Sequence, residues 1–124
     1  MPTIRDVMST ELVTVSPGTT VAEAAAIMSA QHVGSAIVLD GDESLAGIFT
    51  ERDILHALGS DFDAAAHTVH EWMTKDPSTI EAGATVPAAI DRMLEGGFRH
   101  LPVLDGGALV GVVSLRDLSR GSAD

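Results

Sequence analysis

Two segments of the chain place a hydroxyl and a carboxylate at the same short spacing. They read Gly47-Ile48-Phe49-Thr50-Glu51-Arg52-Asp53 and Gly111-Val112-Val113-Ser114-Leu115-Arg116-Asp117. A carboxylate accepts two hydrogen bonds from the vicinal hydroxyls of a ribose, and a hydroxyl with backbone N–H groups at a helix N-terminus suits a phosphate. The spacing is therefore compatible with binding of a phosphorylated ribose at each segment.

The same spacing has a purely structural interpretation. Ser/Thr-x-x-Asp at the start of a helix is also an N-cap with an acidic third residue. Arg52 and Arg116, one position before each Asp, would reach a phosphate at the helix start, but a solvated arginine is equally expected on an exposed helix face. The isolated motif leaves both interpretations open.

Other reactive patterns are absent from the sequence. The chain has no cysteine, so it has no disulfide, no thiolate nucleophile and no Cys-based zinc site. There is no Gly-x-Ser-x-Gly elbow or Walker phosphate loop, and His32, His56, His67 and His70 belong to no HExxH pattern. We therefore expect neither an enzyme nor a metal site, and no required cofactor.

Charge narrows the possible partners. Eighteen acidic residues against seven basic ones give a formal net charge of −11, which repels nucleic-acid backbones and anionic lipid surfaces. The first residues lack a signal-peptide pattern, and no apolar run approaches the roughly 18 residues of a membrane span. We expect a soluble cytoplasmic protein that binds neither nucleic acid nor membrane.

The chain repeats itself once. Sliding the sequence along itself aligns Met8 with Met73, Met28 with Met93 and Val38-Leu39-Asp40-Gly41 with Val103-Leu104-Asp105-Gly106. After a deletion of one residue in the second copy, Gly47 meets Gly111 and Arg52-Asp53 meets Arg116-Asp117. Two copies of one supersecondary unit explain this pattern, and the repeated methionines at apolar positions indicate core packing.

Each copy predicts the element order β-α-β-β-α. In the first copy we expect a strand at 12–15, a helix capped by Thr20 and Glu23 that runs to about Gln31, strands at 36–39 and 45–49, and a helix from Glu51. The second copy repeats this order with a strand near 78–80, a helix at about 85–95, strands at 101–104 and 108–113, and a helix from Leu115. The repeats are assigned to 1–60 and 68–124, with a linker at 61–67 that includes about one helical turn.

The fold class that follows is α+β. Aromatic residues make up only 3% of the chain, so the core is predicted to be aliphatic. Each hairpin has one apolar face that needs cover, and two related units can bury these faces about a pseudo-twofold axis.

These motifs resemble the cystathionine-β-synthase (CBS) domain family. The resemblance is carried by the two Gly-h-h-Ser/Thr-x-x-Asp segments, in which h is apolar, and by the strand Arg99-His100-Leu101-Pro102-Val103-Leu104-Asp105, and it covers nearly the whole chain. It implies a stand-alone pair of CBS domains, called a Bateman module. Such a module holds adenosine compounds such as AMP, ADP or ATP in a cleft between the repeats, and it commonly forms dimers through its helices.

The resemblance also implies which residues bind the nucleotide. The ribose contacts fall on Asp53 and Asp117, with phosphate contacts from the hydroxyls of Thr50 and Ser114. Arg52 and Arg116 are added as candidate phosphate contacts from their position alone, next to each Asp. In nucleotide-binding relatives, basic residues at the positions of Arg99 and His100 also contact phosphate. The first copy has Gly34 and Ser35 at those positions, so we expect two inequivalent sites.

The function expected from these residues is regulation through ligand binding. An adenine nucleotide would shift the protein between two states, the module would form a homodimer, and its target would be a separate polypeptide. The alternative is a dimeric interaction module that binds no ligand, in which Asp53 and Asp117 serve only as caps.

Overall fold

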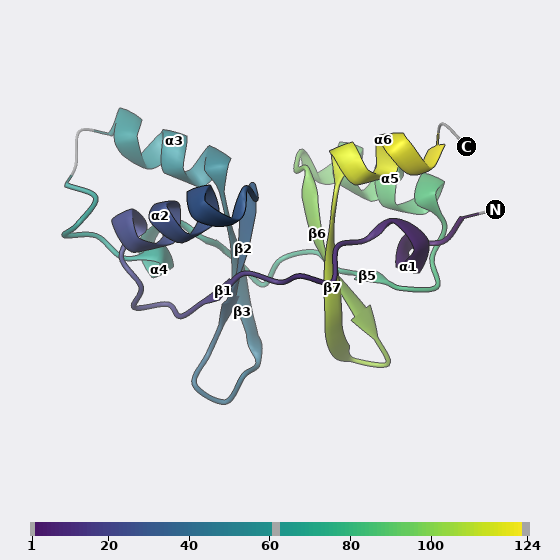
Figure 1. Ribbon diagram of the computed structural model, residues 1–124, viewed down its shortest axis with the longest axis horizontal. Helices are drawn as coiled ribbons and strands as arrows, with labels where there is room; N and C mark the ends of the chain where they lie inside the picture. The colour runs from purple at the N-terminus through teal and green to yellow at the C-terminus, as the bar shows by residue number, and fades with distance from the viewer. Residues whose placement is uncertain (1, 61–62, 123–124) are drawn as a thin grey trace. The chain divides into compact units, whose positions relative to one another are not determined.

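The computed structural model describes residues 2–60 and 63–122, so residues 61 and 62 of the predicted linker lie outside it. The described residues divide into two compact units, one formed by those within 13–77 and the other by 2–12 with 78–122. Each unit has helices packed on one sheet (Figure 1). Within the described ranges, no helix combines the length and the apolar character needed to cross a bilayer.

The unit of residues 13–77 contains a four-stranded sheet in the order β1-β2-β3-β4. Strand β2 runs parallel to β1 and antiparallel to β3, and β3 runs antiparallel to β4. The elements are β1 (Thr14–Val15), α2 (Val21–Gln31), β2 (Ser35–Leu39), β3 (Leu45–Thr50), α3 (Glu51–Gly59), α4 (Val69–Trp72) and β4 (Thr74–Lys75).

The second unit repeats the same plan in a three-stranded sheet, β5-β6-β7, with β5 parallel to β6 and β6 antiparallel to β7. Its elements are α1 (Ile4–Val7), β5 (Ile80–Glu81), α5 (Val86–Gly96), β6 (His100–Asp105), β7 (Ala108–Ser114) and α6 (Leu115–Ser122). The α+β class and the β-α-β-β-α order of both copies are thus confirmed. The short elements α1, α4 and β4 were not predicted, because two to four residues are too few to show a periodicity.

The predicted helix start at Thr20 is confirmed. The Thr20 hydroxyl accepts a hydrogen bond from the Glu23 N–H, and the Glu23 carboxylate accepts one from the Thr20 N–H, at 3.0 and 3.1 Å. In the described part of the linker, a hydrogen bond from the Ala66 N–H to the Asp63 carbonyl closes a turn before α4 begins at Val69. The local capping residues therefore set where these helices begin.

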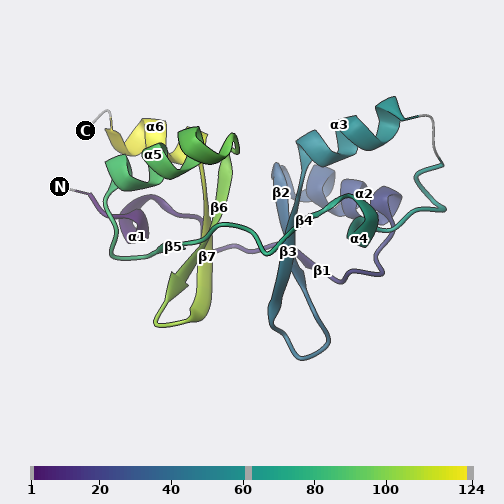
Figure 2. The same ribbon diagram turned by 180° about the vertical axis from the view of Figure 1, so that it is seen from behind.

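The compact units do not coincide with the sequence repeats. The segment that precedes the first repeat's strand packs in the unit of the second repeat, where Ser9 bridges Val112. Conversely, β4 lies in the unit of the first repeat and pairs with β3. Figure 2 shows β4 beside β3, and Figure 1 shows the N-terminal segment beside β7. The repeats thus exchange their leading segments.

Glycine makes this exchange possible at two equivalent positions. A Cβ atom on Gly47 would lie 2.6 Å from the Thr74 carbonyl oxygen and 2.8 Å from the Met73 sulfur. A Cβ atom on Gly111 would lie 2.8 Å from the Ser9 carbonyl oxygen and 2.7 Å from the Met8 sulfur. Since no side chain fits into these distances, each strand needs glycine where the exchanged segment crosses it.

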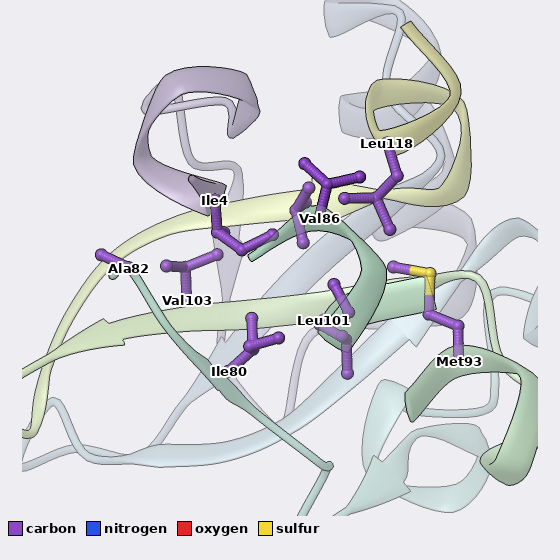
Figure 3. Packing of buried hydrophobic residues seen from close by; sticks show 10 residues of the cluster. Ile4, Ile80, Ala82, Val86, Met93, Leu101, Val103 and Leu118 are labelled. Atoms are coloured by element: carbon purple, nitrogen blue, oxygen red, sulfur yellow. The ribbon is translucent and has the colours of Figure 1, made fainter. Parts of the chain in front are cut away.

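Each unit has its own core, which is aliphatic, as the composition predicts, except for Phe49. In the unit of 13–77, the buried cluster lies between α2 and the helix-facing side of β2 and β3, and it contains Val15, Val21, Ala24, Met28, Ala36, Val38, Phe49 and Val69. Figure 3 shows the equivalent cluster of the other unit, which includes Ile4, Ile80, Val86, Met93, Leu101, Val103 and Leu118. The predicted core positions of Met28 and Met93 are confirmed, since both are buried.

Candidate functional site

The first candidate site lies at the junction of β3 and α3. Thr50 ends the strand in extended conformation and caps the helix: its N–H donates to Asp53 Oδ2 at 2.8 Å, and its Oγ1 donates to the same oxygen at 3.2 Å. The Asp53 N–H in turn donates a hydrogen bond to Thr50 Oγ1 at 3.4 Å. Neither bond from Thr50 uses Asp53 Oδ1. The capping interpretation is therefore confirmed here, and the carboxylate still has an oxygen outside the cap.

Burial distinguishes Asp53 and Asp117 from the capping carboxylates outside the two junctions. Asp6, Glu23 and Glu71 occupy the same third position of their helices and are exposed, and hydrogen bonds from the backbone N–H groups of Thr3, Thr20 and Thr68 lower their pKa values. Asp53 is half-buried, and its burial raises its pKa despite the opposing hydrogen bonds from Thr50 and the nearby charges of His56 and Arg52. A cap alone does not require a desolvated carboxylate, because an exposed one caps equally well.

The second candidate site lies at the junction of β7 and α6 and repeats the same cap. The Ser114 N–H donates to Asp117 Oδ2 at 2.9 Å, and the Asp117 N–H donates to Ser114 Oγ at 3.1 Å. Here Arg120 adds a cation, with one guanidinium nitrogen 3.8 Å from Asp117 Oδ1. The Arg120 side chain is 71% exposed, so this ion pair is weak.

The structure brings Arg99 and His100 to the second junction. His100 lies opposite Ser114 in the antiparallel pair of β6 and β7, and the Arg99 carbonyl accepts a hydrogen bond from the Leu115 N–H at 2.8 Å. The first junction has the same geometry with other residues: Ser35 lies opposite Thr50, and the Gly34 carbonyl accepts from the Glu51 N–H at 3.0 Å. The predicted difference between the two copies thus falls directly beside each helix start.

The remaining predicted site residues, Arg52 and Arg116, are both exposed at the first turn of their helices. Arg99 is exposed as well, and His100 is partly buried. Arg99 and Arg116 are thus two exposed cationic residues next to the second junction. The desolvation of Asp53 was not predicted, because it depends on tertiary packing. The Arg120 ion pair was not predicted either, although its spacing of three residues from Asp117 on a helix indicates it.

Metal binding finds no support here. In the part of the chain that the structure describes, no group of three His, Asp or Glu side chains lies close enough to hold a metal ion. His67 instead contacts the Glu71 carboxylate at 3.1 Å.

Comparison with known proteins identifies related sequences and folds. The family model described as "CBS domain" matches residues 4–60 and again 69–124. An uncharacterized 17.7 kDa protein of Acidianus ambivalens is 40% identical over 123 residues, which cover 98% of this chain and 73% of that protein. The chain spans only 22% of the CBS domain-containing protein CBSCBSPB2 of Arabidopsis thaliana, to which it is 30% identical.

Solved structures share the whole fold. The CBS-domain containing protein ATU1752 from Agrobacterium tumefaciens superposes with a TM-score of 0.90 at 31% identity, covering 97% of this chain and 92% of that one. The CBS domain pair of protein MJ0100 superposes with a TM-score of 0.88 at 26% identity, covering 98% and 99% of the two chains. That structure is a complex with 5′-methylthioadenosine and S-adenosyl-L-methionine.

Proposed function

Since this chain belongs to the CBS-domain family, we propose that it is a non-catalytic regulatory module that binds an adenosine-containing ligand at its two strand-to-helix junctions. The observation that carries the proposal is the half-buried carboxylate of Asp53, whose pKa is raised by burial while those of the exposed capping carboxylates are lowered. The adenosyl ligands of the MJ0100 domain pair support the same ligand class.

In this proposal, each Asp has two roles. One carboxylate oxygen holds the helix cap, and the other accepts hydrogen bonds from the ribose hydroxyls. Asp53 Oδ1 takes part in neither bond from Thr50, whereas Asp117 Oδ1 faces Arg120. The electrostatic environment of Oδ1 therefore differs between Asp53 and Asp117, although both belong to the same sequence motif.

The phosphate group distinguishes the junctions further. At the second junction, the Ser114 hydroxyl, Arg99, His100 and Arg116 supply donors for a phosphate, and charge-assisted bonds of this kind are among the strongest polar contacts. At the first junction, Thr50 and Arg52 act beside Gly34 and Ser35, which carry no charge. We therefore assign phosphorylated nucleotides to the second junction and expect the first to prefer adenosine compounds with less negative charge.

Regulation follows if the ligand binds one conformation or assembly more tightly than another, because binding shifts an equilibrium only by its differential affinity. We further propose that the protein acts as a homodimer and that its target is a separate protein. One observation favours a module without a ligand: both Asp residues make complete helix caps, which would occupy them even if nothing bound.

Calorimetric titration tests the proposal. AMP, ADP, ATP, S-adenosyl-L-methionine and 5′-methylthioadenosine are titrated into the wild type and into Asp53→Asn, Asp117→Asn and the double variant. A hydrogen bond to a charged group contributes about 1.5–3 kcal/mol, so each variant should lose affinity at its own junction by about ten- to hundredfold.

Glu71→Gln is the matched control, because it removes a capping carboxylate of the same geometry outside both junctions. It should leave the affinities unchanged. Absence of heat from all five ligands in a folded wild type would contradict ligand binding and favour the interaction module.

A further inference from the structure

Each junction has a basic residue one helical turn after its Asp. In the alignment of the repeats that pairs Asp53 with Asp117, His56 of α3 corresponds to Arg120 of α6. Both lie three positions after the Asp, and residues at this spacing are neighbours on a helix surface. At the second junction, the Arg120 guanidinium lies 3.8 Å from Asp117 Oδ1. The first junction therefore has a histidine where the second has an arginine beside the carboxylate.

His56 acts electrostatically on the Asp53 carboxylate. Burial raises the pKa of Asp53, and the hydrogen bonds from Thr50 oppose this shift. The charge of His56 also lowers the pKa of Asp53, which places the imidazole within electrostatic reach of the carboxylate. The cap uses Oδ2 of Asp53, so Oδ1 is left for a ligand or a neighbouring cation. Since His56 is exposed, its imidazole exchanges protons with the solvent.

The elements packed against α3 bring few other charges to this pair. Helices α2 and α4 and strand β3 contact α3, and Figure 1 shows α2 beside it. Strand β3 has no charged residue. The other titratable or charged groups on α3 and on these neighbours are Glu23, Glu51, Arg52, Asp53, His70 and Glu71. Glu23 and Glu71 accept backbone N–H groups in their own helix caps. Asp53 is the half-buried member of this set, and the charge of His56 acts on its pKa.

The two basic residues differ in how they respond to pH. An arginine keeps its charge throughout the physiological range, whereas an imidazole in water gains its proton at about pH 6.5. We propose that His56 is a titratable specificity residue of the first junction, which in its protonated form supplies the cation that Arg120 supplies permanently at the second. This inference rests on the ligand binding proposed above and adds a regulation of the same site.

The direction of the effect follows from the charges at the first junction. At alkaline pH, Arg52 is the cation of this junction, and Gly34 and Ser35 add none. Protonation of His56 adds a second cation, which attracts a phosphate and favours the ionised form of Asp53 that accepts from a ribose. A ligand without a phosphate gains only the second effect. The affinity for ATP should therefore rise more in acid than the affinity for 5′-methylthioadenosine.

Titrations at about pH 6 and about pH 8 test this assignment, with ATP and 5′-methylthioadenosine as probes. All proteins carry Asp117→Asn, which confines the comparison to the first junction. The ratio of the two affinities cancels the ribose contact, and comparison between variants cancels the titration of ATP itself. With His56 present, the ratio should shift toward ATP in acid by about two- to fivefold more than in His56→Gln, because an exposed charge contributes little. His56→Arg should keep the preference for ATP at both pH values.

His70→Gln is the matched control, because it removes an exposed histidine from the neighbouring helix α4, and it should retain the pH dependence. Circular dichroism checks that each variant is folded. An unchanged pH dependence in both His56 variants, or its loss in His70→Gln, would overturn the role of His56. Loss of binding in Asp53→Asn would then show that the proposed site stands without it. Failure of both probes to bind at either pH would overturn the proposed function as well.

Discussion

The two strand-to-helix junctions share one hydrogen-bonded frame and differ in what surrounds it. At both junctions, a Thr or Ser residue ends a strand. Its backbone N–H donates a hydrogen bond to the carboxylate of the Asp three residues later, at 2.8 Å in the first junction and 2.9 Å in the second. Around that frame, burial raises the pKa of Asp53 beside Gly34 and Ser35. Asp117 is also partly buried, but it has Arg120 beside it, and Arg99 and His100 adjoin Ser114 and Leu115. The two junctions therefore share the hydrogen-bonded geometry of the cap and differ in the charged residues around it.

The largest expected effect tests the shared frame. Gly47→Ala and Gly111→Ala each force a Cβ atom against a carbonyl oxygen of the exchanged segment, so each should lower the free energy of unfolding by about 1–3 kcal/mol. Urea unfolding measures this. Gly18→Ala and Gly83→Ala form a matched control pair from the same repeat alignment, since a Cβ atom there meets nothing within 4 Å. If the two substitutions lowered the free energy of unfolding by clearly different amounts, the two glycines would not have equivalent structural roles.

The next effect tests the electrostatic difference. Replacing Arg99 and His100 with the residues of the first repeat, as Arg99→Gly with His100→Ser, removes charge-assisted bonds to a phosphate. The affinity of the second junction for ATP should fall about ten- to hundredfold, while that for 5′-methylthioadenosine, which has no phosphate, should change little. Titration of both ligands into the double variant measures the contrast. Equal losses for the two ligands would mean that these residues support the fold rather than bind phosphate.

A smaller effect concerns pH and stability. The pKa of Asp53 is raised in the folded state, so the folded protein binds this proton at a higher pH than the unfolded chain does. Protonated Asp53 therefore favours the folded state in acid, and this contribution to the free energy of unfolding is lost as the pH rises through the raised pKa. Asp53→Asn should remove that loss and make the protein slightly more stable at neutral pH. Glu23 has the opposite sign: its lowered pKa means that its contribution is present at neutral pH and lost as the pH falls.

Urea unfolding at a series of pH values compares the two variants. Glu23→Gln should destabilise the protein at neutral pH and approach the wild type in acid. Asp53→Asn should instead be slightly more stable than the wild type at neutral pH. Destabilisation by both variants would show that the cap, and not burial, dominates the energetics of Asp53.

The smallest effect concerns Arg120. Its exposed guanidinium lies 3.8 Å from Asp117 Oδ1, a distance and exposure at which an ion pair contributes less than about 1 kcal/mol. Arg120→Ala should therefore change the affinity of the second junction for adenosine by no more than about fivefold in a titration. A larger loss would assign Arg120 a direct contact with the ligand and would widen the difference between the junctions.

Much of the fold was predictable from local sequence. The cap at Thr20, the hairpins and the helices from Glu51 and Leu115 depend on residues a few positions apart, and the structure confirms them. Strand β1 was predicted from residue 12 but begins at Thr14, because only Thr14 and Val15 pair with β2. Of the candidate site, the caps were predictable and are observed, whereas ribose and phosphate contacts at Asp53, Asp117, Arg99 and His100 stay predictions.

By itself the sequence determined the duplication, the order of elements in each copy and the positions of the two Ser/Thr-x-x-Asp caps, because these depend on short-range periodicity and capping chemistry. Tertiary structure decided what distant segments contribute. It brought Ser9 to Val112 and Thr74 to Ile48, gave Gly47 and Gly111 their role, and withdrew Asp53 from water. Desolvation and close backbone approach arise only when segments far apart in the chain meet, and no local pattern encodes them.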